Sequence, residues 1–309
     1  MHIPDGFLDA KTALTTGALA AAGVGAALWH AKRSLPARKV PLLGMTAAFV
    51  FAAQMLNFPV AAGTSGHLVG GVLTAALVGP GAAVIVMTAV LVLQCFLFQD
   101  GGVSALGANV FNMAIIGTVG GYAVYALTRR LASGLRGVLL GAAFAGWCST
   151  VMAAVCCAGE LAVSGRVAWR VVLPAMGGIH MLIGIGEGVI TALVLVAVAR
   201  ARPELLETTS EPPKTAQVVT LGLIAALGLA LFVSPFASSW PDGLEKVAER
   251  LGFEHFAADK PLVPAPMPDY GIVGREGPWV TPLVGVIGTL AAFALAWALA
   301  RALTPKKAD

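Results

Sequence analysis

Long apolar stretches separated by short polar connections dominate the sequence. Eight of them approach or exceed the roughly 20 residues that a helix needs to cross a bilayer. These eight cover residues 13–31, 41–57, 81–98, 107–128, 137–157, 177–199, 216–234 and 281–303. A ninth, shorter stretch at 68–79 lies between Gly66 and the Gly79-Pro80 pair, which predicts a broken or deeply inserted helix. The pattern predicts an all-α polytopic membrane protein with about nine transmembrane segments.

The composition agrees with a chain embedded in lipid. Hydrophobic residues make up 58% of the 309 residues, charged residues only 12%, and the mean hydropathy is +0.84. A soluble domain carries about 25% charged residues. The net charge of +4 does not indicate nucleic-acid binding, because Lys and Arg form short clusters between the apolar stretches. The four cysteines lie in or beside apolar stretches without zinc-ligand spacing, as expected of buried thiols.

The basic clusters predict an orientation in the cytoplasmic (inner) membrane. With the N-terminus outside, thirteen of the twenty Lys and Arg fall in short cytoplasmic segments. They are Lys32, Arg33, Arg38, Lys39, Arg129, Arg130, Arg136, Arg200, Arg202, Lys214, Arg301, Lys306 and Lys307. An odd number of spans then leaves the C-terminus in the cytoplasm. We expect the first apolar stretch to be a retained helix, because Asp5 and Asp9 precede it and a basic cluster follows it.

A polar stretch rich in proline predicts two modules. Residues 202–215 contain Pro203 and the Pro212-Pro213 pair, a composition typical of a linker. The N-terminal module, residues 1–201, holds about seven segments. The C-terminal module, residues 216–309, holds two spans joined by a loop at 235–280 that the orientation places outside the cytoplasm.

Coordinating side chains are rare in this sequence, and the first of its five histidines is residue 2. A free α-amine, the amide nitrogen of residue 2 and the His2 imidazole can close two fused chelate rings around one metal ion. These three nitrogens lie in a plane, and one further imidazole completes a square. Square-planar nitrogen donors favour Ni(II) or Cu(II), whereas Zn(II) prefers a tetrahedron. The alternative is that His2 is an ordinary exposed residue beside Met1.

A second histidine, His67, is expected on the same side of the membrane as Met1. It follows the small residues Gly63, Thr64, Ser65 and Gly66. We predict that His67 supplies the fourth nitrogen, although a histidine at a helix start can also be a cap or a packed polar residue. Thr64 and Ser65 are candidate supporting groups beside it.

Three further polar residues are expected within the membrane. His180 and Glu187 are seven residues apart and therefore share one face of a predicted helix. A carboxylate at membrane depth needs a partner or a proton, and both a structural and a functional role remain open for this pair. Asn109 is predicted to form hydrogen bonds between helices or to support the site. His30 and His255 are interpreted as membrane-interface and surface residues.

Small side chains form a stripe on the first apolar stretch. Ala18, Ala22 and Ala26 recur every four residues, a spacing that suits close docking of another helix, from this chain or from a partner.

Four short motifs stand out in the N-terminal module: Met1-His2-Ile3-Pro4-Asp5-Gly6, Gly63-Thr64-Ser65-Gly66-His67, Leu106-Gly107-Ala108-Asn109 and Ile183-Gly184-Ile185-Gly186-Glu187-Gly188. Together they resemble the substrate-capturing membrane component of nickel/cobalt energy-coupling-factor transporters. The motif Trp240-Pro241-Asp242-Gly243-Leu244-Glu245 resembles the small two-span accessory component of the same systems, so the chain looks like a fusion of the two.

The resemblance implies a metal-binding subunit of an ATP-driven importer that is not itself an enzyme. It implies metal ligands from the Met1 amine, the His2 amide and imidazole, and His67. It also implies partners, namely a transmembrane coupling protein that docks on the alanine stripe and cytoplasmic ATPases. Cobalt members more often begin Met-His-Ile-Met-Glu-Gly, so Pro4-Asp5 favours Ni(II) as the transported ion, with Co(II) as the alternative.

The competing class is an intramembrane serine protease of the rhomboid type. Gly63-Thr64-Ser65-Gly66 matches its Gly-x-Ser-Gly motif, and His180 lies on a later predicted span. A Ser–His dyad requires the two side chains to be within hydrogen-bond reach. This reading gives no role to Met1, His2 or the outer loop.

Overall fold

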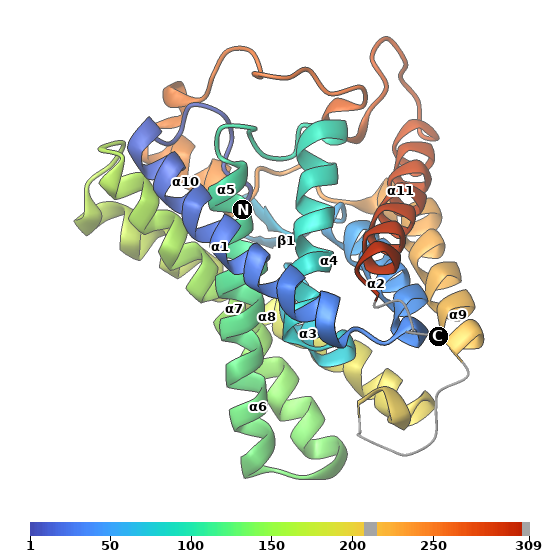
Figure 1. The fold of residues 1–309 in the computed structure, drawn as a ribbon. Coiled ribbons are helices and arrows are strands. Elements are labelled where there is room, and N and C mark those ends of the chain that lie inside the picture. Colours follow the sequence, from blue (N-terminus) through green and yellow to red (C-terminus); the bar gives the residue numbers. More distant parts are fainter. Residues whose placement is uncertain (207–214, 305–309) are drawn as a thin grey trace.

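All nine apolar stretches fold as helices in the computed structural model, which describes residues 1–206 and 215–304 (Figure 1). Seven helical stretches of these residues are long and apolar enough to cross a membrane. They are α1 (Ala10–Ser34), α4 with its extension (Pro80–Phe98), the run from α5 through α6 (Leu106–Leu131), α7 (Gly134–Val163), α8 (Trp169–Ala201), α9 with its extension (Ala216–Phe236) and α11 (Val280–Leu303). The prediction of an all-α polytopic membrane protein is confirmed.

Three of these runs contain π-helical segments, which divide them into the labelled helices. The labelled helices are α4 (Pro80–Leu93), α5 (Leu106–Asn109), α6 (Gly121–Leu131) and α9 (Thr215–Gly228). The π-helical segments are Gln94–Phe98, Val110–Gly120 and Leu229–Val233.

The other two apolar stretches form shorter helices, α2 (Val40–Gln54) and α3 (Gly71–Val78), of 15 and 8 residues. A helix rises about 1.5 Å per residue, so neither matches the roughly 30 Å hydrocarbon core by itself. Helix α3 ends at Gly79, whose φ of +91° favours glycine, and Pro80 begins α4. The predicted short helix is present, and the total of nine crossings stays a prediction. The predicted linker at 202–215 lies largely outside the described residues.

Helix α2 forms the main contact between the two modules. It is apolar on every side and almost entirely buried, because α9 and α11 of the C-terminal module pack against it. Small residues permit close approach: Gly44 of α2 lies against Phe293 of α11, and Ala52 packs with Ala226 of α9. Close van der Waals packing of this kind holds helices together in lipid. The two modules therefore form one packed bundle.

A short β-hairpin, which the hydrophobic pattern does not predict, connects α2 to α3. Strands β1 (Phe58–Ala61) and β2 (Thr64–Gly66) pair antiparallel. The two turn residues, Ala62 and Gly63, have φ values of +53° and +72°, the left-handed conformation that a tight hairpin turn requires. The hairpin ends immediately before His67 and so determines the position of this histidine.

The loop at 235–280 covers the end of the bundle that carries the hairpin and the N-terminal segment (Figure 1). It contains α10 (Gly243–Leu251), which Asp242 caps by accepting hydrogen bonds from the Leu244 and Glu245 amides. The Glu245 side chain accepts the Asp242 amide in return, which completes a capping box. Leu244 and Val247 of α10 are buried, and α10 packs against α8.

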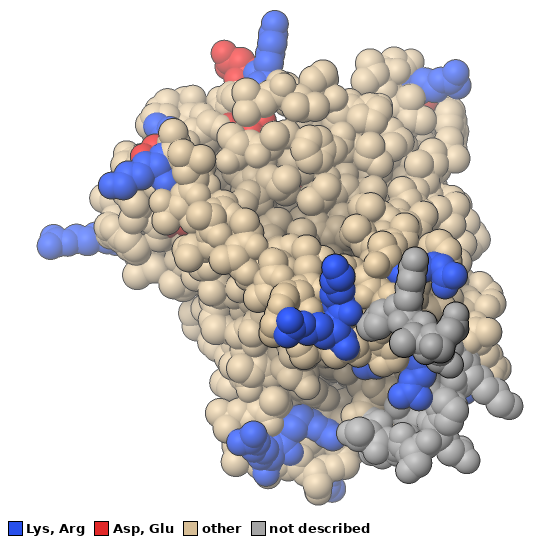
Figure 2. All heavy atoms as spheres, in the orientation of Figure 1, with Lys and Arg blue, Asp and Glu red and all other residues tan. Residues whose placement is uncertain are grey.

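Charged side chains are sparse on the surface. On the face in Figure 2, most atoms belong to uncharged residues, and Lys and Arg form small separated groups. Basic residues occupy the last turns of α1, α6, α8 and α11, ends that the positive-inside rule assigns to the cytoplasm. The orientation itself stays a prediction.

The contact between α2 and α11 can be tested at Gly288, where an added methyl group would lie 2.1 Å from Cζ of the fully buried Phe51. Gly288→Ala should lower the free energy of unfolding by about 1–3 kcal/mol. Gly178→Ala in α8 is the control, because nothing lies within 4 Å of the added group; it should be neutral or stabilise by about 1 kcal/mol. Thermal unfolding in detergent measures both, and equal melting temperatures would contradict this packing.

Candidate metal centre

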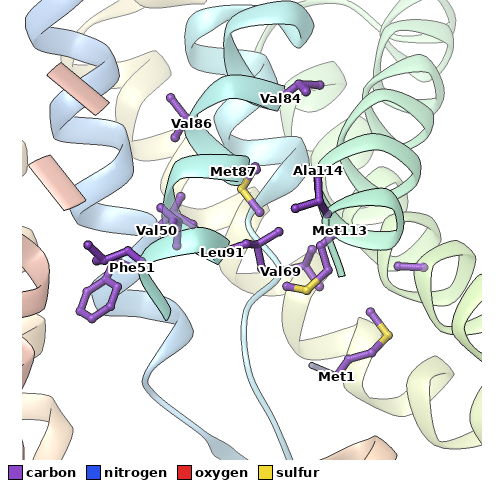
Figure 3. Packing of buried hydrophobic residues seen from close by; sticks show 14 of the residues in the cluster. Met1, Val50, Phe51, Val69, Val84, Val86, Met87, Leu91, Met113 and Ala114 are labelled. Atoms are coloured by element: carbon purple, nitrogen blue, oxygen red, sulfur yellow. The ribbon is translucent and has the colours of Figure 1, made fainter. Parts of the chain in front are cut away.

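The first residues of the chain lie inside the bundle. Met1 is 5% exposed and Ile3 is fully buried, and the Met1 side chain belongs to the core cluster that contains Val69 and Met113 (Figure 3). Ile3 is held at both of its main-chain groups: its N–H donates to Asn109 Oδ1 at 2.8 Å, and its carbonyl accepts from Asn109 Nδ2 at 3.1 Å. Asn109, a predicted supporting residue, therefore fixes the register of the terminus.

Asp5 and Gly6 hold the next part of this segment between the two modules. The Asp5 carboxylate accepts hydrogen bonds from the Ser104 amide and hydroxyl at 2.8 and 2.7 Å and from the Leu262 amide at 3.2 Å. Gly6 has a φ of +92°, and a Cβ there would lie 2.2 Å from the Phe256 carbonyl oxygen. A glycine is required at this position because the outer loop approaches so closely.

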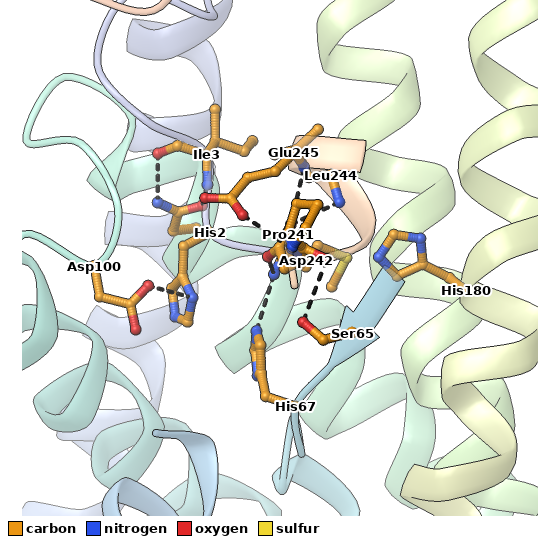
Figure 4. Close-up of polar contacts among 12 residues, drawn as sticks. His2, Ile3, Ser65, His67, Asp100, His180, Pro241, Asp242, Leu244 and Glu245 are labelled. Atoms are coloured by element: carbon orange, nitrogen blue, oxygen red, sulfur yellow. Dashed lines mark hydrogen bonds and ion pairs between the residues drawn. The ribbon is translucent and has the colours of Figure 1, made fainter. Parts of the chain in front are cut away.

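The α-amine of Met1 is buried beside two side chains. It lies 2.9 Å from His67 Nε2 and forms an ion pair with Asp242 (Figure 4). The other His67 nitrogen, Nδ1, lies 3.0 Å from the Leu68 carbonyl oxygen. A carbonyl oxygen only accepts, so we assign the proton to Nδ1, which leaves the Nε2 lone pair facing the amine. This tautomer suits a metal ligand.

The His2 imidazole lies beside His67 but points toward another carboxylate. The two rings stack with centroids 5.2 Å apart and an angle of 19° between their planes. His2 Nδ1 lies 2.9 Å from Asp100 Oδ1, and Nε2 has no partner among the described residues. The structure thus brings together Met1, His2 and His67, the three residues that the sequence singled out.

The electrostatic surroundings of the site favour a neutral His67 imidazole and ionised Asp100 and Asp242 carboxylates. Burial, with the positive charge of the Met1 amine nearby, lowers the pKa of His67 to about 3. Burial alone would raise the pKa of Asp242, but the positive charge of the Met1 amine outweighs this effect and holds that pKa well below its usual range. His2 likewise overcomes burial and lowers the pKa of Asp100. Both carboxyl groups are therefore ionised at neutral pH.

Asp100 and Tyr270 are contacts that the sequence did not single out, and Asp242 appeared there only as part of the accessory-component motif. Asp100 lies in a polar turn after α4, and its Oδ2 accepts a hydrogen bond from the Tyr270 hydroxyl at 2.5 Å. The only sequence signal was the rarity of acidic residues in this chain. The motif that contains Asp242 does not predict a contact with Met1.

Glu187 positions the segment that follows His67. Its carboxylate is fully buried and accepts hydrogen bonds from the Val69 amide at 2.5 Å and the Gly70 amide at 3.0 Å. The partner that a carboxylate needs at membrane depth is therefore a pair of main-chain N–H groups. This contact lies two and three residues after His67, so it supports the site without facing it.

Ser65 and His180 do not form a dyad. The Ser65 hydroxyl donates to the Trp240 carbonyl at 2.7 Å, whereas His180 Nδ1 lies 2.8 Å from the Met176 carbonyl. The rhomboid-protease alternative therefore has no support. The Thr64 hydroxyl is buried without a partner among the described residues. The other two histidines, His30 and His255, are exposed.

A cavity of about 390 Å³ lies between the two modules at this site. His2 and His67 line it from the N-terminal module, and Asp242, Glu245 and Asp269 line it from the outer loop. No group of three or more His, Cys, Asp or Glu side chains within the described residues is arranged to hold a metal ion.

Comparisons with known proteins identify the family of this chain. Residues 2–205 match the family described as "Cobalt uptake substrate-specific transmembrane region", and residues 216–305 match the PDGLE domain. The chain is 38% identical over 303 residues to a putative fused nickel transport protein NikMN of Archaeoglobus fulgidus, which covers 97% of this chain and 98% of that protein. It is 34% identical over 250 residues to the fused nickel transport protein NikMN of Rhodobacter capsulatus, covering 76% and 72% of the two chains.

A solved structure extends the likeness to three dimensions. The crystal structure of a truncated transition metal transporter is 35% identical, with a TM-score of 0.60, and covers 65% of this chain and 99% of that one. The cobalt transport protein CbiM of Geobacter sulfurreducens is 32% identical over 233 residues, which are 70% of this chain and 66% of that protein. The chain therefore belongs to the cobalt uptake substrate-specific transmembrane family and carries a PDGLE domain fused to its C-terminal side.

Proposed function

We propose that this chain captures Ni(II) at the outer face of the cytoplasmic membrane for ATP-driven uptake by partner subunits. The ligands are the Met1 amine, the His2 amide and imidazole, and His67. The observation that carries the proposal is the buried Met1 amine 2.9 Å from His67 Nε2. Neighbouring corners of a square with metal–nitrogen distances of about 2.0 Å lie about 2.8 Å apart. The amine and His67 are thus already at the spacing of two adjacent ligands.

Metal capture requires a rearrangement of His2, and the Met1 ammonium group and the His2 amide each have to release a proton to water before their nitrogens can bind the ion. His2 Nδ1, the ring nitrogen that closes a chelate with its own amide, lies 2.9 Å from Asp100 Oδ1. The imidazole has to exchange this carboxylate for the metal. Asp100 then remains beside the site as a negative charge that favours a divalent cation.

Nickel is the transported ion that the donor set favours. Four nitrogen donors in a square suit Ni(II) and Cu(II), whereas Zn(II) prefers a tetrahedron. Two relatives that match most of this chain are named nickel transport proteins, and another is named a cobalt transport protein. Co(II) is therefore the alternative.

Energy for uptake has to come from partners. The sequence contains no Gly-Lys pair and so no phosphate-binding loop of the Gly-x-x-x-x-Gly-Lys type. We propose that cytoplasmic ATPases act through a transmembrane coupling protein that docks on α1. The side chains of Ala18, Ala22 and Ala26 are all exposed along this helix, which leaves a surface of small residues for another helix.

The ligand set is tested by removing each imidazole. His2→Ala and His67→Ala should each weaken nickel binding at least about 100-fold, because one nitrogen ligand is lost. His30→Ala and His255→Ala are matched controls at exposed histidines and should bind as the wild type does. Equilibrium titration with nickel measures all four, and normal binding by His67→Ala would refute the site.

The proposed chelate at the N-terminus can be tested by moving His2 one position along the chain. The amine, amide and imidazole form fused rings only when histidine is the second residue, so one Ala inserted between Met1 and His2 should abolish high-affinity binding. A tag after Asp309 is the control and should have no effect, because we place that end across the membrane. Nickel titration of the two proteins decides the matter: unchanged affinity after the insertion would make His2 a bystander.

The partner proposal is tested on the exposed face of α1. Ala22→Trp should prevent co-purification with the coupling protein and ATPases and abolish uptake, because a large side chain blocks close helix approach. Leu140→Trp, at another exposed position with 56% of the side chain accessible, should change neither. Radioactive nickel uptake is the measurement. Strong accumulation by cells that lack every such ATPase would count against energy coupling.

A further inference from the structure

Asp242 belongs to the C-terminal module but contacts the first atom of the chain. Its two carboxylate oxygens contact different groups. Oδ1 accepts hydrogen bonds from the Leu244 and Glu245 amides at 2.8 and 2.9 Å and so caps α10. Oδ2 pairs with the Met1 amine, 241 residues away in the sequence (Figure 4). The cap alone would not require the second oxygen, because serine and asparagine cap helices as well as aspartate does.

The N-terminal module fixes the turn that presents Asp242. The Ser65 amide donates to the Pro241 carbonyl at 2.9 Å, and the Ser65 hydroxyl donates to the Trp240 carbonyl at 2.7 Å. These bonds attach the turn to strand β2, two residues before His67. The same hairpin therefore positions His67 and, through the turn, the carboxylate that faces the amine.

Gly243 allows this docking because it has no side chain. A Cβ at Gly243 would lie 2.7 Å from Ile183 Cδ1 and 2.8–2.9 Å from the His180 ring atoms Cε1 and Nε2. The contact between His180 Nδ1 and the Met176 carbonyl fixes the orientation of the His180 ring. The turn that contains Gly243 packs against this ring. This contact explains a buried histidine that the proposed ligand set does not use.

Without Asp242, the chain terminus would lose the partner of its charge. A buried ammonium group needs a counter-charge, and an unpaired one would move toward water and away from His67. Asp242 also lines the 390 Å³ cavity, together with His2 and His67. A divalent cation that enters this cavity therefore meets the Asp242 carboxylate beside the two imidazoles.

We infer that Asp242 is the residue through which the outer loop acts on the metal site: its Oδ2 holds the Met1 amine beside His67, ready for capture. This inference rests on the proposed function. Asp242 is a positioning residue rather than a member of the final ligand set. It governs how fast nickel is captured, because a fixed terminus does not have to find the site each time.

Asp242→Asn provides the test, because the amide oxygen can still cap α10 while the amide nitrogen cannot pair with an ammonium group. The variant should capture nickel about tenfold more slowly in stopped-flow measurements. The Met1 amine should also react faster with an amine-selective acylating reagent in the metal-free protein, as read by mass spectrometry. A purely structural role in α10 would not change acylation of Met1.

Glu249→Gln is the matched control, since it removes the same charge from an exposed position of the same helix, where Glu249 pairs with Lys246. It should match the wild type in both measurements. If Asp242→Asn lowers the melting temperature, Asp242→Ser carries the same test, because serine keeps the cap but is too short to reach the amine.

A second variant moves the turn without changing Asp242. Gly243→Ala should slow capture and speed acylation as Asp242→Asn does. His180→Ala together with Ile183→Val in the same chain should restore both, because these changes remove the ring atoms and the Cδ1 methyl group that the added Cβ would meet. Nickel capture and Met1 acylation within twofold of wild type in Asp242→Asn would overturn the inference. Equal nickel binding by the wild type and His67→Ala would instead overturn the proposed function.

Discussion

The positive charge of the chain's own N-terminus is buried inside the bundle, and the arrangement of the site follows from the need to compensate it. The Met1 amine lies between His67 Nε2 and the Asp242 carboxylate. A buried charge is tolerated only with a partner, so the outer loop has to reach the first residue of the chain. The bonds between Asn109 and Ile3 set the depth to which the terminus enters.

The two modules are coupled because this buried terminus lies at their boundary. Helices α9 and α11 pack on α2 within the bundle, while the loop between them covers the N-terminal segment at its end. Glycines mark the closest approaches, with Gly288 against Phe51 in the helices and Gly6 against the Phe256 carbonyl in the loop. Each approach excludes a side chain, which makes the relative position of the modules well defined.

Two buried carboxylates of the helices accept hydrogen bonds from amide groups. Glu187 on α8 accepts the amides of Val69 and Gly70, and thereby orders the chain directly after His67. Asn112 donates to Glu160 of α7 at 2.7 Å, a second buried carboxylate with an amide partner. In an apolar medium such bonds have few competitors, so a small number of them defines the conformation of the segment that carries His67, a proposed metal ligand.

The sequence by itself predicted the helices, singled out His2 and His67, and placed Asn109 and Glu187 among the few polar residues of the apolar stretches. Apolar runs and the rarity of polar residues are local signals, which lipid as solvent makes unusually clear. Only the tertiary structure decided that α2 is a short helix enclosed by both modules, that a hairpin presents His67, and that Asp100 and Asp242 face the site. Those contacts join residues up to 241 positions apart. They depend on how the helices pack, and no periodicity within a single stretch encodes that packing.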